Sequence, residues 1–133
     1  MTRALVIDDD DIARELLVSV LKDGGYETFE LPSPIGATQT IFQEQIDVVV
    51  LDVMMPALSG DKLARMLRSN PRLRSLVIVL VSSASMDDLK QLAASVKADA
   101  VVSKRDVRKS LLSAIMFART AVSAETSRRP SPP

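Results

Sequence analysis

Residues 47–60 read DVVVLDVMMPALSG, and this stretch decides the fold. Four consecutive apolar residues, Val48 to Leu51, precede the carboxylate Asp52, and a Met-Pro and a Ser-Gly pair follow. A short apolar run bounded by a turn signal is typical of a strand buried on both faces, as in parallel sheets. Asp52 is therefore predicted at the carboxyl end of a buried strand, where open α/β sheets bind ligands. Within this stretch alone, a carboxylate that only caps a turn would look the same.

The rest of the chain alternates short apolar runs with segments of helical periodicity. Five such units favour an open, doubly wound α/β fold with a parallel sheet, and they are too few for an eight-unit barrel. Ser33 is predicted to cap the second helix, with Pro34 in its first turn. The predicted strands are 4–7, 26–31, 48–52, 76–81 and 100–103, and the predicted helices are 11–23, 34–45, 61–69, 86–96 and 106–122. We expect one domain over residues 1–122 and a disordered tail over 123–133, SAETSRRPSPP.

Composition narrows the class of protein. The chain has 17 basic and 17 acidic side chains, so its net charge is zero. It lacks the positive charge that attracts proteins to nucleic acid, and we expect no direct contact with nucleic acid. It has no cysteine for disulfides or thiolate metal sites, and no histidine to act as a base or to carry a phosphohistidine. No apolar run could span a bilayer, and the N-terminal run is too short for a signal peptide, which predicts a cytoplasmic protein without membrane contact.

Four predicted strands end in polar residues that can do chemistry: Asp8 and Asp9, Asp52, Ser82, and Lys104. Since parallel strands end at the same edge of a sheet, we expect these side chains to converge. Crowded carboxylates repel one another unless a cation compensates, and all-oxygen ligands suit Mg²⁺. Lysine and serine can donate hydrogen bonds to phosphoryl oxygens, so Asp52 is a candidate nucleophile that forms an acyl phosphate.

Each of these residues alone also has an ordinary interpretation. The run Asp8 to Asp11 could be a solvated loop and a helix cap, Ser82 could satisfy a loop backbone, and Lys104 could lie on the surface. Ser83 offers a second hydroxyl beside Ser82, although the spacing favours Ser82. The functional hypothesis depends on all four strand ends carrying complementary groups together.

From residue 2 to residue 122 the chain resembles the response-regulator receiver domains of two-component signalling. The resemblance implies a flavodoxin-like (βα)5 fold with strand order 2-1-3-4-5. It rests on these positions: the acidic pair Asp8 and Asp9 in LVIDDDDIARELL, the phosphoacceptor Asp52 with Pro56 and Gly60 in VVLDVMMPALSG, the hydroxyl of Ser82, and Lys104 after VKADAVVS.

The resemblance implies a phosphoacceptor switch that is not an enzyme. Because only a short tail follows the last predicted helix, we expect a stand-alone receiver, and a receiver excised from a longer chain stays open as the alternative. A phosphohistidine on a sensor histidine kinase or a histidine phosphotransfer protein would donate its phosphoryl group to Asp52. Mg²⁺ would be bound by Asp9, Asp52 and the backbone carbonyl of Met54, with Asp8 supporting the site.

In such a switch Ser82 would contact the phosphoryl group and Lys104 would pair with it. The face made by the fourth helix, fifth strand and fifth helix would then change its binding of a downstream protein or of a second copy of the chain.

The sequence departs from the family pattern at several positions. Arg105 follows the lysine where the family usually has proline, and Val101 occupies the position of an aromatic switch residue. Met54 and Ala84 lie two residues beyond the phosphoacceptor and the hydroxyl residue, and neither side chain can hold an attacking water. We therefore expect slow intrinsic loss of the phosphoryl group.

Two alternative functions stay open at this stage. Val101 and Arg105 are compatible with a pseudo-receiver that scaffolds without phosphorylation, and Asp8 to Ile12 loosely resembles the nucleophile motif of haloacid-dehalogenase-like phosphatases, with Asp8 as the nucleophile. The predicted buried stripe of the last helix consists of Val107, Leu111, Ile115, Ala118 and Val122. Met116 and Phe117 lie off this stripe, and they could pack against the fourth helix or the tail, or contact a partner.

Overall fold

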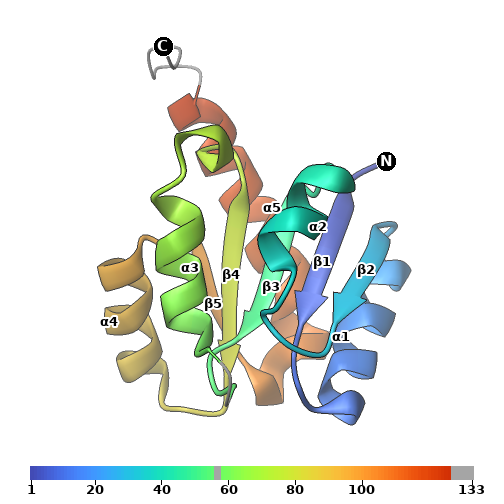
Figure 1. Cartoon of the computed structure of the whole chain (residues 1–133). Coiled ribbons are helices and arrows are strands. Elements are labelled where there is room, and N and C mark those ends of the chain that lie inside the picture. Colours follow the sequence, from blue (N-terminus) through green and yellow to red (C-terminus); the bar gives the residue numbers. More distant parts are fainter. Residues whose placement is uncertain (56–57, 127–133) are drawn as a thin grey trace.

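The computed structural model describes residues 1–55 and 58–126, and it shows a parallel sheet between two layers of helices (Figure 1). The strand order is β2-β1-β3-β4-β5, and every neighbouring pair is parallel, which confirms the predicted fold class and strand order. The strands are β1 Arg3–Ile7, β2 Glu27–Leu31, β3 Val48–Asp52, β4 Val77–Ser82 and β5 Ala100–Ser103. The helices are α1 Asp11–Asp23, α2 Ala37–Gln43, α3 Gly60–Arg68, α4 Met86–Val96 and α5 Val107–Thr126, with short 3₁₀ turns at Pro71–Leu73 and Lys104–Asp106.

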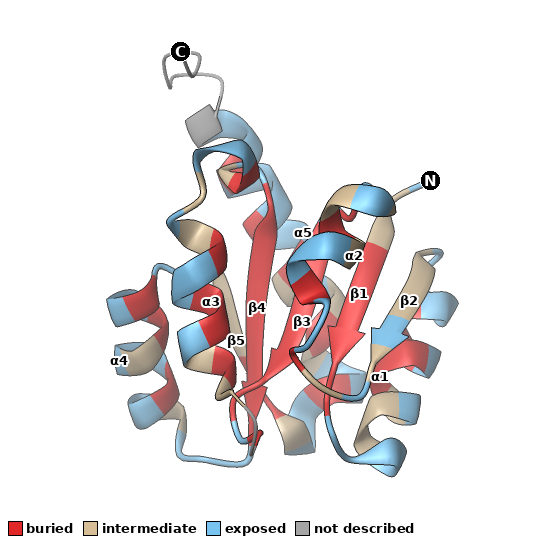
Figure 2. Ribbon diagram, in the orientation of Figure 1, coloured by how far each residue is buried: buried red, intermediate tan, exposed pale blue. Residues whose placement is uncertain are grey.

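The central strands β3 and β4 are buried along their whole length (Figure 2). Successive side chains of a strand point to opposite faces of the sheet, so each strand contributes to two apolar clusters. One cluster packs α2, α3 and α4 on one face, and the other packs α1 and α5 on the opposite face. The continuous apolar runs of the sequence follow from this double coverage.

Two helices begin at side-chain caps that the sequence contains. The Asp10 carboxylate accepts a hydrogen bond from the Ala13 N–H at 3.0 Å at the start of α1. The Ser85 hydroxyl accepts one from the Asp88 N–H at 3.3 Å at the start of α4, as the capping pattern predicted. Helix α1 and strands β3 and β5 have the predicted bounds.

The predicted start of the second helix is wrong. Helix α2 begins at Ala37, after Gly36 with φ +82°, a left-handed conformation that glycine adopts without strain. Because a right-handed helix cannot run through this residue, Ser33 does not cap it. The Ser33 hydroxyl instead accepts a hydrogen bond from the Ile35 N–H at 3.3 Å, within the preceding turn.

Helix α5 continues to Thr126, past the boundary predicted at Val122, and no proline occurs before Pro130 to stop it. Residues 127–133 of the predicted tail lie outside the described residues. The predicted stripe of α5 is buried: Val107, Leu111, Ile115, Ala118 and Val122. No helix in the described part of the chain combines the length and the apolar character needed to cross a membrane.

Candidate functional site

The polar residues predicted at the strand ends gather at the carboxyl edge of the sheet. Asp8 follows β1, Asp52 and Ser82 are the last residues of β3 and β4, and Lys104 follows β5. Asp8 and Ser82 are fully buried and Asp52 is 2% exposed. Charged and polar side chains are rarely buried to this degree unless partners compensate, so this edge is the first place to look for function.

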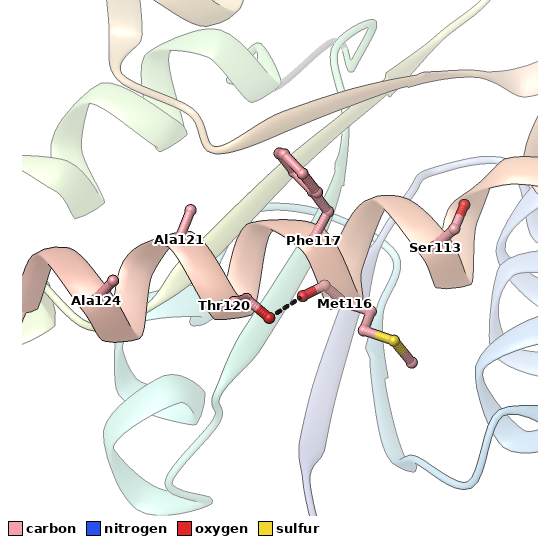
Figure 3. A pocket seen from close by; sticks show the side chains of 6 residues that line it. All are labelled: Ser113, Met116, Phe117, Thr120, Ala121 and Ala124. Atoms are coloured by element: carbon pink, nitrogen blue, oxygen red, sulfur yellow. Dashed lines mark hydrogen bonds between the residues drawn. The ribbon is translucent and has the colours of Figure 1, made fainter.

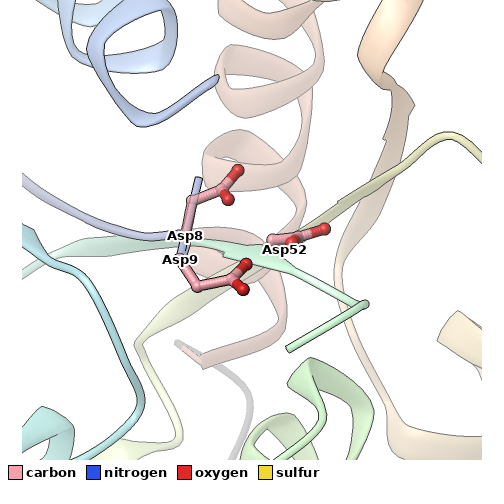
Figure 4. Close-up of side chains that lie close together, drawn as sticks. All are labelled: Asp8, Asp9 and Asp52. Carbon is pink, nitrogen blue, oxygen red and sulfur yellow. The ribbon is translucent and has the colours of Figure 1, made fainter. Parts of the chain in front are cut away.

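Three carboxylates converge at this edge (Figure 4). Asp8, Asp9 and Asp52 each offer a carboxylate oxygen, and these oxygens lie within 4.8 Å of one another. Oδ1 of Asp8 accepts a hydrogen bond from the Asp10 N–H at 2.9 Å, and Oδ1 of Asp52 accepts one from the Met54 N–H at 3.3 Å. Asp9 is exposed and faces the solvent side of the cluster.

Lys104 is the cation that faces this cluster. Its Nζ lies 3.4 Å from Oδ2 of Asp8 and 3.4 Å from Oδ1 of Asp52, so one ammonium group contacts both buried carboxylates. Burial alone would lower the pKa of Lys104, but the negative charges of Asp52 and Asp8 outweigh it and raise that pKa. The lysine is therefore fully charged at neutral pH.

The carboxyl of Asp52 has a raised pKa. Burial is the largest cause, the neighbouring charge of Asp8 adds to it, and the ammonium of Lys104 opposes both without cancelling them. The negative charge of this carboxylate is poorly compensated by its surroundings. Its free energy therefore falls when a cation binds to it or when it forms a bond to an electrophile. This is the electrostatic condition expected of a buried nucleophile.

The donor set fits a hard divalent cation. Oδ2 of Asp8 is buried; it lies 3.4 Å from the ammonium of Lys104 but makes no hydrogen bond within the described residues, and the oxygens of Asp9 and Asp52 lie beside it. Oxygen ligands with this surplus of negative charge suit Mg²⁺. Met54 lies two residues beyond Asp52 and is held there by its N–H, while its side chain is 70% exposed.

Ser82 lies at the carboxyl end of β4, next to the strand that ends in Asp52. Asp52 pairs in register with Val81 of β4, so Ser82 is the next residue toward the site. Its Oγ accepts a hydrogen bond from the Ala84 N–H at 3.1 Å, in a local turn. Ser83 is exposed, so the buried hydroxyl of the pair is that of Ser82.

Gly60 supports the site from the start of α3. Its N–H donates to the Val53 carbonyl at 3.0 Å, and a Cβ at this position would overlap the backbone carbonyl of Asp52. Only glycine allows α3 to approach β3 this closely. Pro56, the other matched residue of this loop, lies outside the described residues.

The structure shows the surroundings of Val101 and Arg105, the two residues that depart from the family pattern near Lys104. Val101 is half-buried and packs against the α2–α3–α4 cluster. The peptide bonds of the described residues are all trans, including that between Lys104 and Arg105. A 3₁₀ turn at Lys104–Asp106 carries the chain directly into α5.

Ser103 is a polar residue at this edge that the sequence analysis did not predict. Ser103, the last residue of β5, is 5% exposed, and its Oγ has no hydrogen-bond partner among the residues that the structure describes. In the sequence it is one hydroxyl within an apolar strand, and only the strand register shows that it faces Ser82.

Comparison with known proteins agrees with this geometry. The sequence model of the response regulator receiver domain matches residues 4–116. The chain is 29% identical to the transcriptional regulatory protein GltR of Pseudomonas aeruginosa, covering 84% of this chain and 46% of that protein. It is 30% identical to the phosphate regulon transcriptional regulatory protein PhoB of the same organism, covering 75% and 44% respectively. The chain thus spans less than half the length of these relatives.

Solved structures share the fold. The chemotaxis protein CheY4 of Vibrio cholerae superposes with a TM-score of 0.80 at 23% identity, covering 89% of this chain and 98% of that one. A response regulator receiver domain protein from Clostridium thermocellum gives a TM-score of 0.80 at 23% identity, covering 94% and 99%. The 3',5'-cyclic-nucleotide phosphodiesterase regA of Dictyostelium discoideum, 34% identical over 87 residues, matches this chain over only 11% of its own length.

Proposed function

Because the chain belongs to the response regulator receiver domain family, we propose that it is a phosphoacceptor switch with Asp52 as the acceptor. The observation that carries the proposal is the pairing of a buried, poorly compensated carboxylate with the ammonium of Lys104, 3.4 Å away. The chain contains no histidine and cannot carry a phosphohistidine itself, so the phosphoryl group must come from another molecule. Membership of the family favours a phosphohistidine of a sensor histidine kinase or a histidine phosphotransfer protein as that donor.

In the transfer step an ionised oxygen of Asp52 attacks the phosphorus atom. The bond between phosphorus and the partner's imidazole nitrogen breaks, its electron pair stays on that nitrogen, and an acyl phosphate forms. Lys104 donates to a phosphoryl oxygen and balances its charge. Asp9, Asp52 and the Met54 carbonyl, with Asp8 in support, would hold Mg²⁺, and the bound ion would neutralise the charge of the phosphoryl oxygens.

Ser82 supplies the link from the acyl phosphate to the rest of the molecule. Its hydroxyl is engaged with the Ala84 N–H at 3.1 Å, and a phosphoryl group on Asp52 offers it a stronger, charged acceptor. Its movement toward that group favours a second arrangement of the face formed by α4, β5 and α5.

An exposed apolar patch on α5 is the surface that we propose for a protein partner (Figure 3). Phe117 is 80% exposed and Met116 is 68% exposed, and together with Ser113, Thr120, Ala121 and Ala124 they line a shallow apolar hollow. Isolated exposed apolar residues are common, whereas a contiguous group of this kind favours contact with a protein. The partner is a downstream protein or a second copy of the chain.

The proposed acceptor can be tested with a small phosphodonor. Incubation with Mg²⁺ and acetyl phosphate, followed by intact mass measurement, is expected to add one phosphoryl group. Asp52→Asn is expected to abolish the addition, and chelation of the metal to suppress it. If the wild-type chain gains no phosphoryl group, the result would favour the scaffold function. If Asp8→Asn gains none while Asp52→Asn still does, the result would favour Asp8 as a phosphatase-like nucleophile.

The proposed partner surface is tested separately from the chemistry. Phe117→Ala is expected to weaken phosphorylation-dependent self-association or partner binding while leaving the mass increment unchanged. Lys109→Ala, an exposed change on the same helix, is the control. Association that is identical in the Phe117→Ala and wild-type chains would contradict the assignment.

A further inference from the structure

Ser103 carries a buried hydroxyl that the proposed function does not use. It is 5% exposed, and its Oγ is one of only two buried side-chain polar atoms in the described part of the chain that lack a hydrogen-bond partner. The other is Oδ2 of Asp8, which has a use in the metal site. A buried hydroxyl without a partner costs free energy that an alanine would not, so its presence needs an explanation other than packing, and a second state in which it is paired is one.

The strand register places Ser103 beside Ser82. The two residues are partners in the β4–β5 pairing, and neighbouring strands lie about 4.8 Å apart. Leu80 of β4 and Val101 of β5 both pack into the α2–α3–α4 cluster, and side chains two residues apart share a face. The hydroxyls of Ser82 and Ser103 therefore project from the same face of adjacent strands, at the same level.

Ser82 has a hydrogen bond that it must exchange if it moves. Its Oγ accepts from the Ala84 N–H at 3.1 Å. A serine hydroxyl has one donor hydrogen and two acceptor lone pairs, so Ser82 can donate to a phosphoryl oxygen and still accept a hydrogen bond. When it turns away from Ala84, that acceptor site needs a new donor, and the unpaired hydroxyl of Ser103 is the neighbouring group that can supply one.

We propose that Ser103 is a positioning residue: its O–H donates to Oγ of Ser82 when Ser82 turns to hydrogen-bond the phosphoryl group on Asp52. This inference rests on the proposed phosphoacceptor function and adds a residue to it. The exchange replaces the Ala84 N–H by the Ser103 hydroxyl as the donor to Ser82. It releases the loop that leads to α4 and satisfies an oxygen that is unpaired before phosphorylation.

The proposal makes opposite predictions for folding and for phosphoryl binding. In the unphosphorylated chain the Ser103 hydroxyl makes no hydrogen bond within the described residues, so Ser103→Ala is expected to leave the urea midpoint unchanged or to raise it. With the phosphoryl group in place the same change removes a hydrogen bond, so binding of a phosphoryl analogue is expected to weaken. A serine that served only to pack the strand end would weaken folding and leave the analogue unaffected.

The test measures binding of beryllofluoride, in the presence of Mg²⁺, to the full chain. Ser103→Ala and Ser103→Val are expected to bind about threefold to tenfold more weakly than the wild type, the size of one neutral hydrogen bond. Ser103→Thr keeps the hydroxyl in the shape of valine and is expected to restore near-wild-type binding. In a Ser82→Ala background the additional Ser103→Ala change is expected to have no effect, because Ser103 acts through Ser82.

The outcomes separate this inference from the function on which it rests. If the wild type binds beryllofluoride and gains a phosphoryl group, but Ser103→Ala and Ser103→Val bind as tightly as the wild type, the role of Ser103 is overturned and the proposed function stands. An effect of Ser103→Ala that persists undiminished in the Ser82→Ala background also overturns it. A wild-type chain that takes neither group overturns both.

Discussion

The two edges of the sheet differ in how fully their charged groups are paired. At the amino edge, where β4 and β5 begin, Arg68 donates through Nη2 to Oδ2 of Asp99 at 2.5 Å, through Nε to the Lys97 carbonyl and through Nη1 to the Leu76 carbonyl. The same Asp99 oxygen accepts from the Ile78 N–H at 2.8 Å. Both charges of this ion pair therefore have further hydrogen-bond partners.

At the carboxyl edge three carboxylates cluster, and the two buried ones, Asp8 and Asp52, share the ammonium of Lys104. The two buried polar atoms that lack a hydrogen-bond partner within the described residues, Oδ2 of Asp8 and Oγ of Ser103, both lie here. Satisfied groups stabilise a single arrangement, whereas unsatisfied groups leave free energy to be gained when a ligand arrives. We infer that the amino edge contributes mainly to folding and the carboxyl edge mainly to switching.

The largest effect is expected from removing the Arg68 side chain. Arg68→Ala leaves a largely buried carboxylate and two carbonyls without their donor, so the free energy of unfolding is expected to fall by about 3 kcal/mol in urea titrations. Arg65→Ala, on an exposed position of the same helix, is the control and is expected to cost less than about 0.5 kcal/mol. Equal losses in the two variants would remove the proposed distinction between the edges.

A methyl group at Gly60 is expected to have the next largest effect. Gly60→Ala places a Cβ against the Asp52 carbonyl, and relief of the overlap is expected to cost about 1–3 kcal/mol of stability and to slow phosphorylation by displacing Asp52. Ser59→Ala is the matched control, because the Ser59 side chain makes no cap hydrogen bond. Phosphorylation of Gly60→Ala at the wild-type rate would show that the close approach serves packing alone.

Neutralising Asp52, the proposed acceptor, is expected to stabilise the fold. The pKa of Asp52 is raised in the folded chain, chiefly by burial, so its contribution to stability is present below its unfolded pKa and is lost as pH rises through the folded pKa. Asp52→Asn is therefore expected to raise the free energy of unfolding at pH 7 by about 1 kcal/mol, and the gain is expected to vanish near pH 4.

Urea titrations of Asp52→Asn and the wild type across this pH range provide the measurement. Glu15→Gln removes one exposed negative charge from α1 and serves as the control for net charge. If Asp52→Asn is less stable than the wild type at pH 7, Lys104 compensates Asp52 more fully than we infer.

The smallest effect is expected from a surface change beside the acceptor. The Met54 side chain is 70% exposed and cannot hold a water by hydrogen bonding, whereas an amide can. Met54→Asn is expected to speed the decay of the phosphorylated chain about threefold to tenfold, the worth of one hydrogen bond to the attacking water. Met54→Leu is expected to decay like the wild type, and an unchanged rate in Met54→Asn would contradict the predicted cause of slow phosphate loss.

The fold and most of the candidate site follow from local patterns in the sequence. The apolar runs that end at Asp52 and Ser82 mark buried strands, and parallel strands must bring their carboxyl ends together. The sequence therefore places Asp8, Asp52 and Lys104 at one edge without any knowledge of the distances between them, and the ion pairs of Lys104 agree with that placement.

The features that the sequence did not predict depend on neighbours or on single backbone angles. The start of α2 was misplaced because Ser33 and Pro34 match a common cap, while the left-handed angle at Gly36 depends on the path of the chain. Ser103 was missed because a hydroxyl in a strand has no visible partner in the sequence. Its unpaired state becomes evident only when β5 is aligned with β4.

Because one 3₁₀ turn joins Lys104 to α5, we infer that a displacement of Lys104 would tilt this helix. Its 20 residues extend about 30 Å, so a tilt of about 5° at the lysine would carry the far end by about 2–3 Å. The chain has no cysteine, so a thiol introduced at the exposed Ser123 would be unique and could carry a fluorescent label. The end of α5 farthest from Asp52 is therefore the position from which the state of the site can be observed with the greatest amplification.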